Sequence, residues 1–409
     1  MFKPTQKFID MYFEALDKGT LEQLKYNNAD FLDGIDLSNP EIMDSLKALA
    51  KTKRFENIDL SRIKIPHETY LLGNSPYVES WTDTVIWPED VPFSPQQILE
   101  DAKHPTEMDA LHTQGFTGKG IAIAIIDQRL YLDHPEYKDR IKHYEMVGHW
   151  PKEMKEPADY HGSLVTGCAV GKTTGTAPDA DVYYIAANNW PIKEDAPYIK
   201  AIEKALNEPL KMGHRYNVIM AIKRILEINK TLPENKKIHF LSCSWGSEQD
   251  QLREQCDELF DECERNGIMV IGGFYKPNRN KTRPSTKTGK TIHSDGQDVT
   301  EKCKQYPGIP TDQKTTPYFK GGYIYKKRGG SSSTFPYIAG VFACACQGNQ
   351  IFFTRPNWQD ELFQILTQTS ITDTNGGKMI NPIGIRERVT QIAREMEINL
   401  IQQQSLQHE

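Results

Sequence analysis

One short run limits the fold of this chain more than any other: six apolar residues, Ile121 to Ile126, followed at once by Asp127. A strand without polar alternation is buried on both faces, which is typical of the centre of a parallel sheet covered by helices. Three other runs have the same texture, namely "DVYYIAA", "IHFLSCS" and "IMVIGGF". The segments between them have helical patterns: "APYIKAIEKALNE", "YNVIMAIKRILEINK" and "EQDQLREQCDELFDECERNG". This alternation predicts an α/β fold with a doubly wound, mostly parallel sheet.

A chain of 409 residues can hold one large α/β domain and a smaller extension. The α/β texture begins near Gln96, so we expect a main domain over residues 96–409 and an N-terminal region over residues 1–95. In that region apolar residues from Phe8 to Leu16 recur at helical spacing, and "PEIMDSLKALAK" predicts a second helix capped by Asn39. We interpret residues 1–95 as an accessory domain or a pro-region.

Composition and charge favour a soluble, globular protein, and the lack of targeting and membrane-spanning segments favours the cytoplasm. The formal net charge is -6, a quarter of the residues are charged and 10% are aromatic. Asp10, Glu14 and Asp17 interrupt the apolar residues near the N-terminus, so we expect no signal peptide. No apolar run approaches the ~18 residues of a membrane span. We therefore expect neither a membrane nor a nucleic acid as a partner.

Seven cysteines lie mostly in apolar segments and lack the paired spacing of a zinc site or a redox motif. They are Cys168, Cys243, Cys256, Cys263, Cys303, Cys344 and Cys346. We expect reduced thiols in the core.

Residues 276–328 form a basic insertion, with thirteen Lys and Arg against four Asp and Glu. One interpretation is a long solvated loop that happens to be basic. The other is a docking surface for an acidic partner or substrate.

Three separate stretches offer chemically useful side chains. Asp127 follows the central strand and therefore faces the crevice where such sheets bind ligands. His161 precedes Gly162 and a helix of small and apolar residues, which places its imidazole at a helix edge. The stretch "GGSSSTFPYIAG" has two glycines for a tight turn, then serines, then a helix expected from about Thr334 with Pro336 in its first turn. Each residue alone is more often a cap, a core histidine or a turn residue.

Taken in order, these stretches resemble the subtilase family, the subtilisin-like serine peptidases, over roughly Glu107 to Arg394. Other segments resemble the family at ordered places: "ALHTQGFTGKGIAIAIID", "DHPEY", "GTAPDADVYYIAA", "LSCSWG" and "GGKMINPIGIRERV". The resemblance implies the three-layer, subtilisin-like form of the α/β fold. It also implies a serine peptidase that acts on protein or peptide substrates.

The segment "GSSSTFPYIAG" is similar to the family motif GTSMASPHVAG, and this match places Ser332 on the nucleophile. The resemblance then implies that His161 is the general base and that Asp127 holds its imidazole. It also places Ser244, Trp245 and Gly246 along the substrate cleft, where their backbone would pair with an extended peptide.

Four departures from the family pattern bear on activity. Lys276 stands where the family has its oxyanion-hole Asn, so the donor there would be an ammonium or a nearby Asn278 or Asn280. Gln128 and the bulky Arg129 follow Asp127, where the family has a small residue and a glycine.

The other two departures lie on the two helices expected after His161 and after the serine run. Leu164 replaces a second histidine, and Phe335-Pro336-Tyr337 replaces Ser-Pro-His. The stretch from His161 to Pro178 is short and supplies no carboxylates, so we expect no calcium there, and we expect no other metal or cofactor.

The function that follows is a serine endopeptidase working through an acyl-enzyme. Two alternatives stay open: a pseudoprotease or regulatory module that binds a partner in the same cleft, motivated by Lys276, and an esterase or acyltransferase with the same triad.

Overall fold

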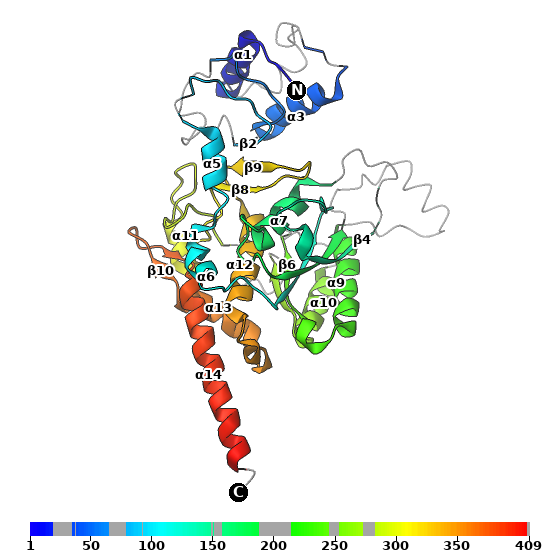
Figure 1. Cartoon of the computed structure of the whole chain (residues 1–409), viewed down its shortest axis with the longest axis vertical. Helices are drawn as coiled ribbons and strands as arrows, with labels where there is room; N and C mark the ends of the chain where they lie inside the picture. The colour runs from blue at the N-terminus through cyan, green and yellow to red at the C-terminus, as the bar shows by residue number, and fades with distance from the viewer. Residues whose placement is uncertain are drawn as a thin grey trace, which may run out of the picture.

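The computed structural model describes ten stretches of the chain. They are residues 1–18, 35–36, 38–64, 79–91, 93–148, 150, 158–187, 214–244, 253–272 and 283–406. The N-terminal region forms one end of an elongated molecule, the α/β body lies in the middle, and the C-terminal helix projects from the other end (Figure 1).

A five-stranded parallel sheet forms the centre of the body. Its strands are β3 (Ala122–Asp127), β4 (Ile141–Val147), β5 (Asp181–Ala187), β6 (Ile238–Cys243) and β7 (Met269–Gly272). Their order is β4-β5-β3-β6-β7, so the apolar run before Asp127 occupies the middle, and every residue of β3 is buried. The predicted α/β fold with a mostly parallel sheet is confirmed.

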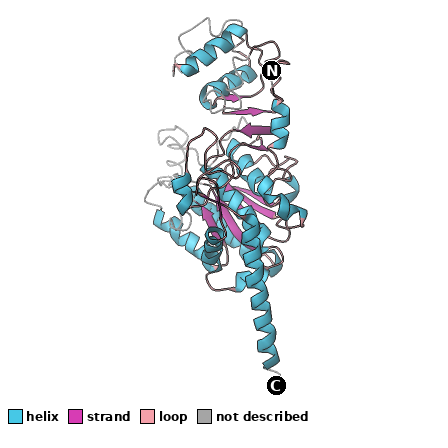
Figure 2. Ribbon diagram, turned by 90° about the vertical axis from the view of Figure 1, so that its left-hand side faces the viewer, coloured by secondary structure: helices cyan, strands magenta, loops and turns pink. Residues whose placement is uncertain are grey.

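Helices cover both faces of this sheet, which gives the three layers (Figure 2). Alternate side chains of β3 divide between two apolar cores: Ile123 and Ile125 belong to one, Ala124 and Ile126 to the other. The first core is closed by α6 (Asp109–Thr113), α7 (Tyr160–Val170), α12 (Ser331–Cys346), α13 (Trp358–Gln368) and α14 (Pro382–Leu406). The second is closed by α9 (His214–Thr231) and α10 (Arg253–Arg265). The predicted helix at 196–208 lies outside the described residues.

All seven cysteines are buried free thiols, as expected. Burial raises the pKa of Cys168 and of Cys303 to about 12, so the neutral thiol is the stable form inside the core.

The N-terminal region contains both predicted helices, α1 (Gln6–Asp17) and α3 (Pro40–Thr52). Asn39 caps α3, since its side-chain oxygen accepts a hydrogen bond of 2.9 Å from the Glu41 amide. A third helix, α5 (Pro95–Asp101), leads into the body.

A second sheet joins the N-terminal region to the body. Its order is β1-β2-β9-β8, with β1 (Arg54–Phe55), β2 (Ser80–Thr82), β9 (Tyr323–Lys326) and β8 (Lys314–Pro317). The N-terminal strand β2 therefore pairs directly with β9 of the body (Figure 1). Trp81 packs on Tyr325 at 4.3 Å between ring centroids, so apolar packing accompanies the strand pairing.

The described part of the basic insertion, residues 283–328, differs from a solvated loop. It supplies β8, β9 and α11 (Thr300–Gln305). Its cations make ion pairs, among them Lys314 with Glu107 at 3.6 Å and Lys320 with Glu56 at 3.2 Å. Part of the positive charge thus faces acidic residues of the same chain.

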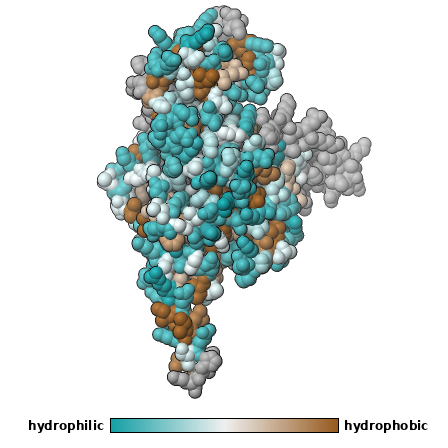
Figure 3. Space-filling view, in the orientation of Figure 1, coloured by the Kyte–Doolittle hydropathy of each residue, from teal (hydrophilic) through white to brown (hydrophobic). Residues whose placement is uncertain are grey.

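The C-terminal helix α14 packs against α12 and α13 and then continues past the body. Exposed apolar side chains, Ile398, Leu400, Ile401 and Leu406, lie on its projecting end. Apolar surface is visible there in Figure 3. A small hairpin, β10 (Ile371–Thr372) with β11 (Lys378–Met379), precedes the helix. Within the described stretches, no helix combines the length and the apolar character that crossing a bilayer requires.

Trp81→Ala tests the sheet that joins the two regions. Trp81 is 1% exposed, so its removal is expected to lower the free energy of unfolding by about 3–5 kcal/mol, because an aromatic-sized cavity opens. Ile86→Ala, at a side chain 44% exposed, is the control, with an expected change within about 0.5 kcal/mol. Denaturant unfolding measures both, and equal small changes in the two variants would contradict the packing described.

Candidate active site

The carboxylate of Asp127 is buried at the end of the central strand. Because β3 lies between β5 and β6, the Asp127 side chain is 0% exposed. Oδ1 accepts a hydrogen bond of 2.8 Å from the Gln128 amide, while Oδ2 has no hydrogen-bond partner among the described residues. A carboxylate in such a place needs a charged or hydrogen-bonding neighbour, because burying an unpaired charge is costly.

His161 is that neighbour, and a glycine brings it into reach. A Cβ on Gly162 would lie 2.6 Å from Tyr184 Oη and 2.7 Å from the Gln128 carbonyl oxygen, so only glycine lets the first turn of α7 approach the turn after β3. The approach sets His161 Nδ1 2.7 Å from Asp127 Oδ1. Two of the three expected triad residues therefore meet.

Two opposing influences act on the pKa of His161. Burial lowers it, but the charge of Asp127 and the hydrogen bond to it together outweigh burial, so the pKa is raised above its ordinary value. The charge of Lys326 opposes the rise. The ring is 24% exposed, so it remains open to a ligand on the solvent side.

Ser332 lies in the first turn of α12, beside the end of β6. The helix begins at Ser331 rather than at Thr334, and Gly330 before it has φ 73°, a conformation that favours glycine. Ser332 Oγ donates to the Ser244 carbonyl at 3.4 Å. Among the described residues no hydrogen bond joins Ser332 to His161.

Pro336 lies inside the helix and explains how Ser332 and Ser244 are linked. Proline has no N–H, so the carbonyl of Ser332, four residues earlier, has no helical donor. The Ser244 hydroxyl donates to it at 2.9 Å instead. The predicted cleft residue Ser244 thus binds the backbone of the predicted nucleophile.

The helices that carry His161 and Ser332 pack closely against each other. A Cβ on Gly340 would lie 2.9 Å from the Ala169 carbonyl oxygen, so glycine is required where α12 crosses α7. Cys168 Sγ donates to the Ser333 carbonyl at 3.3 Å across the same contact. Leu164, at the position of the second family histidine, is buried in the first core.

Arg129 is the bulky residue that follows Asp127 and Gln128 in the sequence. In the structure its guanidinium makes a bidentate ion pair with Asp159. Its Nε and Nη2 lie 2.9 and 3.1 Å from the two Asp159 oxygens. Asp159 is the residue just before α7, so the bidentate pair anchors the start of the helix that carries His161. Sequence reasoning missed Asp159, although its place two residues before His161 was a usable signal.

Three of the predicted site residues lie outside the described residues: Trp245, Gly246 and Lys276. Asn278 and Asn280, the alternative donors for an oxyanion, lie outside them as well. Their roles stay predictions.

Comparison with models of known protein families identifies the family of this chain. The family model described as the subtilase family matches residues 118–385, which include Asp127, His161 and Ser332. The chain belongs to the subtilase family.

One curated relative of this subtilase is the subtilisin-like protease PopC of Myxococcus xanthus (strain DK1622). It is 35% identical over 80 residues, a match that covers 18% of this chain and 17% of the relative. The match thus spans less than a fifth of the length of that curated protein.

Solved structures with a similar fold are more distant in sequence. The prenylagaramide maturation protease PagA is 15% identical with a TM-score of 0.49, covering 69% of this chain and 98% of that one. A cold adapted subtilisin-like serine proteinase is 17% identical with a TM-score of 0.43, covering 64% and 89%.

Asp127→Asn is expected to lower the pKa of His161 below its ordinary value of 6.5, because burial then acts without the opposing carboxylate. NMR titration of the ring measures the change. Asp373→Asn is the control and leaves the pKa where it is, since Asp373 binds the amides of Thr291 and Gly377 and has no contact with His161 among the described residues. In the wild type the folded-state pKa is the higher one, so the His161–Asp127 pair stabilises the fold below about pH 6.5, and this stabilisation is lost as the pH rises through the folded-state pKa. Equal titration curves in wild type and Asp127→Asn would contradict the assignment.

Proposed function

We propose that this subtilase is a serine endopeptidase in which Asp127, His161 and Ser332 form the catalytic triad. The observation that carries the proposal is the 2.7 Å contact between His161 Nδ1 and the buried Asp127 carboxylate. A carboxylate on Nδ1 leaves Nε2 as the ring nitrogen that can take a proton. Family membership supports the same assignment.

In the proposed reaction Ser332 Oγ attacks the scissile carbonyl carbon while its proton passes to His161 Nε2. The tetrahedral intermediate collapses as the imidazolium gives that proton to the leaving amine, and an acyl-enzyme ester remains on Ser332. Water, deprotonated by His161, then attacks the ester and releases the carboxylic acid with the serine restored. Asp127 stabilises the imidazolium at both stages.

Ser332 must first exchange its contact with the Ser244 carbonyl for one with His161. The 3.4 Å separation of that contact marks it as weak, so little is lost when the hydroxyl turns away. Catalytic hydrogen bonds are often long in an unliganded enzyme and shorten in the complex with substrate.

The backbone N–H of Ser332 is the first proposed donor to the oxyanion. It belongs to the first turn of a helix of 16 residues, where amides lack helical partners and the helix dipole favours negative charge. Lys276 is the proposed second donor, at the place of the family asparagine. The substrate would be an extended peptide that pairs with the backbone after β6, beginning at Ser244.

A fluorophosphonate, which reacts with activated serines, tests the assignment of the nucleophile. Peptide mass spectrometry is expected to find the adduct on Ser332, and none in Ser332→Ala. His161→Ala is expected to slow labelling ~10⁴-fold or more, because the serine loses its base. Ser331→Ala, at the exposed neighbouring hydroxyl, is the matched control and keeps the reaction.

The outcomes separate the candidate functions. A folded wild-type protein that takes no adduct, or a Ser332→Ala variant that takes as much as the wild type, overturns the proposal. Cleavage of activated esters without cleavage of any peptide in a proteome digest would replace the endopeptidase with an esterase.

We also propose that residues 1–95 stay attached as a permanent accessory domain. Strand β2 lies inside the second sheet, between β1 and β9, so its loss would leave β9 with an open edge. The Lys327 amide donates to the Glu79 carbonyl at 2.9 Å, and the Tyr323 amide donates to Asp83 at 3.0 Å. The Arg54 guanidinium lies 5.5 Å from the ring centroid of Tyr160, which is the residue before His161.

Intact mass spectrometry of purified wild type and Ser332→Ala tests this attachment. The expected result is a full-length chain in both, because the N-terminal strand is part of the folded body. A shortened chain produced only when Ser332 is present would show that the region is a pro-region removed by self-processing.

A further inference from the structure

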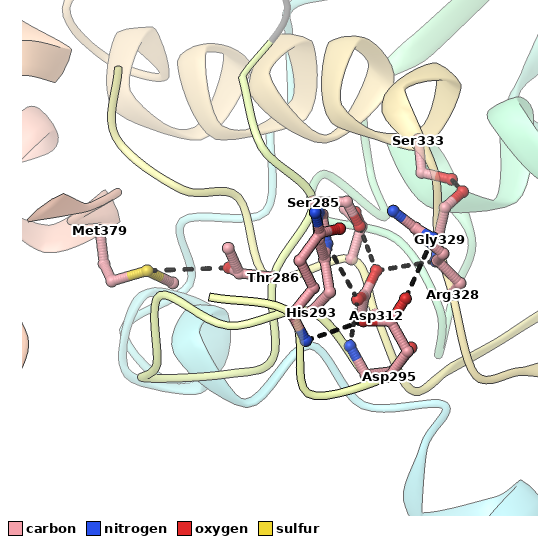
Figure 4. A network of polar contacts seen from close by, with 12 residues as sticks. Ser285, Thr286, His293, Asp295, Asp312, Arg328, Gly329, Ser333 and Met379 are labelled. Carbon is pink, nitrogen blue, oxygen red and sulfur yellow. Dashed lines mark hydrogen bonds and ion pairs between the residues drawn. The ribbon is translucent and has the colours of Figure 1, made fainter. Parts of the chain in front are cut away.

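A buried carboxylate outside the triad holds the turn that presents Ser332. Asp312, whose side chain is 0% exposed, lies on the segment before β8 (Figure 4). Its Oδ1 accepts a hydrogen bond of 2.9 Å from the Gly329 amide and another from the Ser285 hydroxyl. Gly329 is the first residue of the glycine turn that leads into α12, three positions before Ser332.

The other oxygen of Asp312 is also engaged. Oδ2 accepts a hydrogen bond of 2.8 Å from the Ser294 amide. His293 Nδ1 lies 3.6 Å from Oδ2, which is longer than a hydrogen bond. The carboxylate therefore joins two segments of the basic insertion, around residues 285 and 294, to the turn at residue 329, and each of its hydrogen-bonding partners is a donor.

Both backbone polar groups of Gly329 are held by hydrogen bonds. Its N–H is held by Asp312, and its carbonyl accepts a hydrogen bond of 2.8 Å from Ser333 Oγ (Figure 4). A Cβ at residue 329 would lie 2.6 Å from the carbonyl carbon of Thr311, so the turn is pressed against the Asp312 segment with no room for a side chain. Ser332, in the first turn of α12, lies between Gly329 and Ser333, the two residues that this last hydrogen bond joins.

We propose that Asp312 is a positioning residue for the nucleophile. It holds the Gly329 amide, and through this turn it sets the place of Ser332 Oγ and of the Ser332 N–H at the start of α12. The inference rests on the proposed role of Ser332. Geometry of this kind matters because a displacement of about 1 Å at a reacting group can cost ~10²-fold in rate.

Asp312→Asn is the decisive substitution because it keeps the shape and removes one acceptor. The amide NH₂ must face a donor on one side, either the Gly329 and Ser285 pair or the Ser294 amide, so the clamp is broken on that side. With a fluorophosphonate, kinact is expected to fall at least ~10-fold while KI stays unchanged, since the cleft still binds the reagent but the serine is misplaced.

Asp373→Asn is the matched control. Asp373 accepts from the Thr291 amide at 2.8 Å and from the Gly377 amide at 3.0 Å, so it clamps the neighbouring β10–β11 hairpin in the same manner, without contacting the turn before α12. Its substitution is expected to lower the melting temperature and to leave kinact unchanged. A purely structural Asp312 would behave like Asp373.

Hydrogen exchange of peptides that contain the Gly329 and Ser294 amides gives a readout that needs no activity. In Asp312→Asn whichever of these amides faces the new NH₂ group is expected to exchange faster, because it loses its acceptor. A labelled wild type with an unchanged kinact in Asp312→Asn overturns the positioning role. A folded wild type that takes no label overturns the proposed function instead, and unchanged exchange at both Gly329 and Ser294 overturns the clamp itself.

Discussion

The burial of β3 on both faces is the constraint on which the rest of this structure depends. Its alternate side chains supply two separate apolar cores, so the strand can only lie in the middle of the sheet. A strand in that position carries the residue after its apolar run, Asp127, into the interior, where a carboxylate needs a partner. The first turn of α7 provides one, and Gly162 allows the close approach that this contact requires.

The layered body could be predicted from the sequence because its signals are local. Runs without polar alternation mark β3, β5, β6 and β7, and each of them is a strand of the parallel sheet. The second sheet could not be predicted in this way. Strands β1 and β2 have only two and three residues, too few for any periodicity, and β2 owes its place to pairing with a strand more than two hundred residues later. The sequence predicts the start of α12 three residues late, because Pro336 is typical of a first helical turn. In the structure the hydroxyl of Ser244, the residue after β6, donates to the carbonyl that Pro336 leaves without a helical donor.

In the candidate site too, some contacts could be predicted from the sequence and others could not. The contact between Asp127 and His161 is implied by the resemblance to the subtilase family, and it is present. The expected cleft residue Ser244 does meet Ser332, while Trp245, Gly246 and Lys276 stay predictions. Asp312 gave no signal in the sequence, because its contacts join residues 285, 294 and 329, whose proximity depends on how a long insertion folds. The sequence shows only that Arg129 is bulky. Its partner Asp159 lies 30 positions away, so the ion pair between them becomes evident only in the folded structure.

The missing N–H of Pro336 has a mechanical consequence. The carbonyl of residue 332 is tied to the neighbouring strand rather than to its own helix, through the Ser244 hydroxyl. If Ser332 is the nucleophile, as proposed, a peptide that pairs with the backbone at Ser244 would contact the residue that holds the Ser332 carbonyl. The rest of α12 is buried in the core and would stay in place.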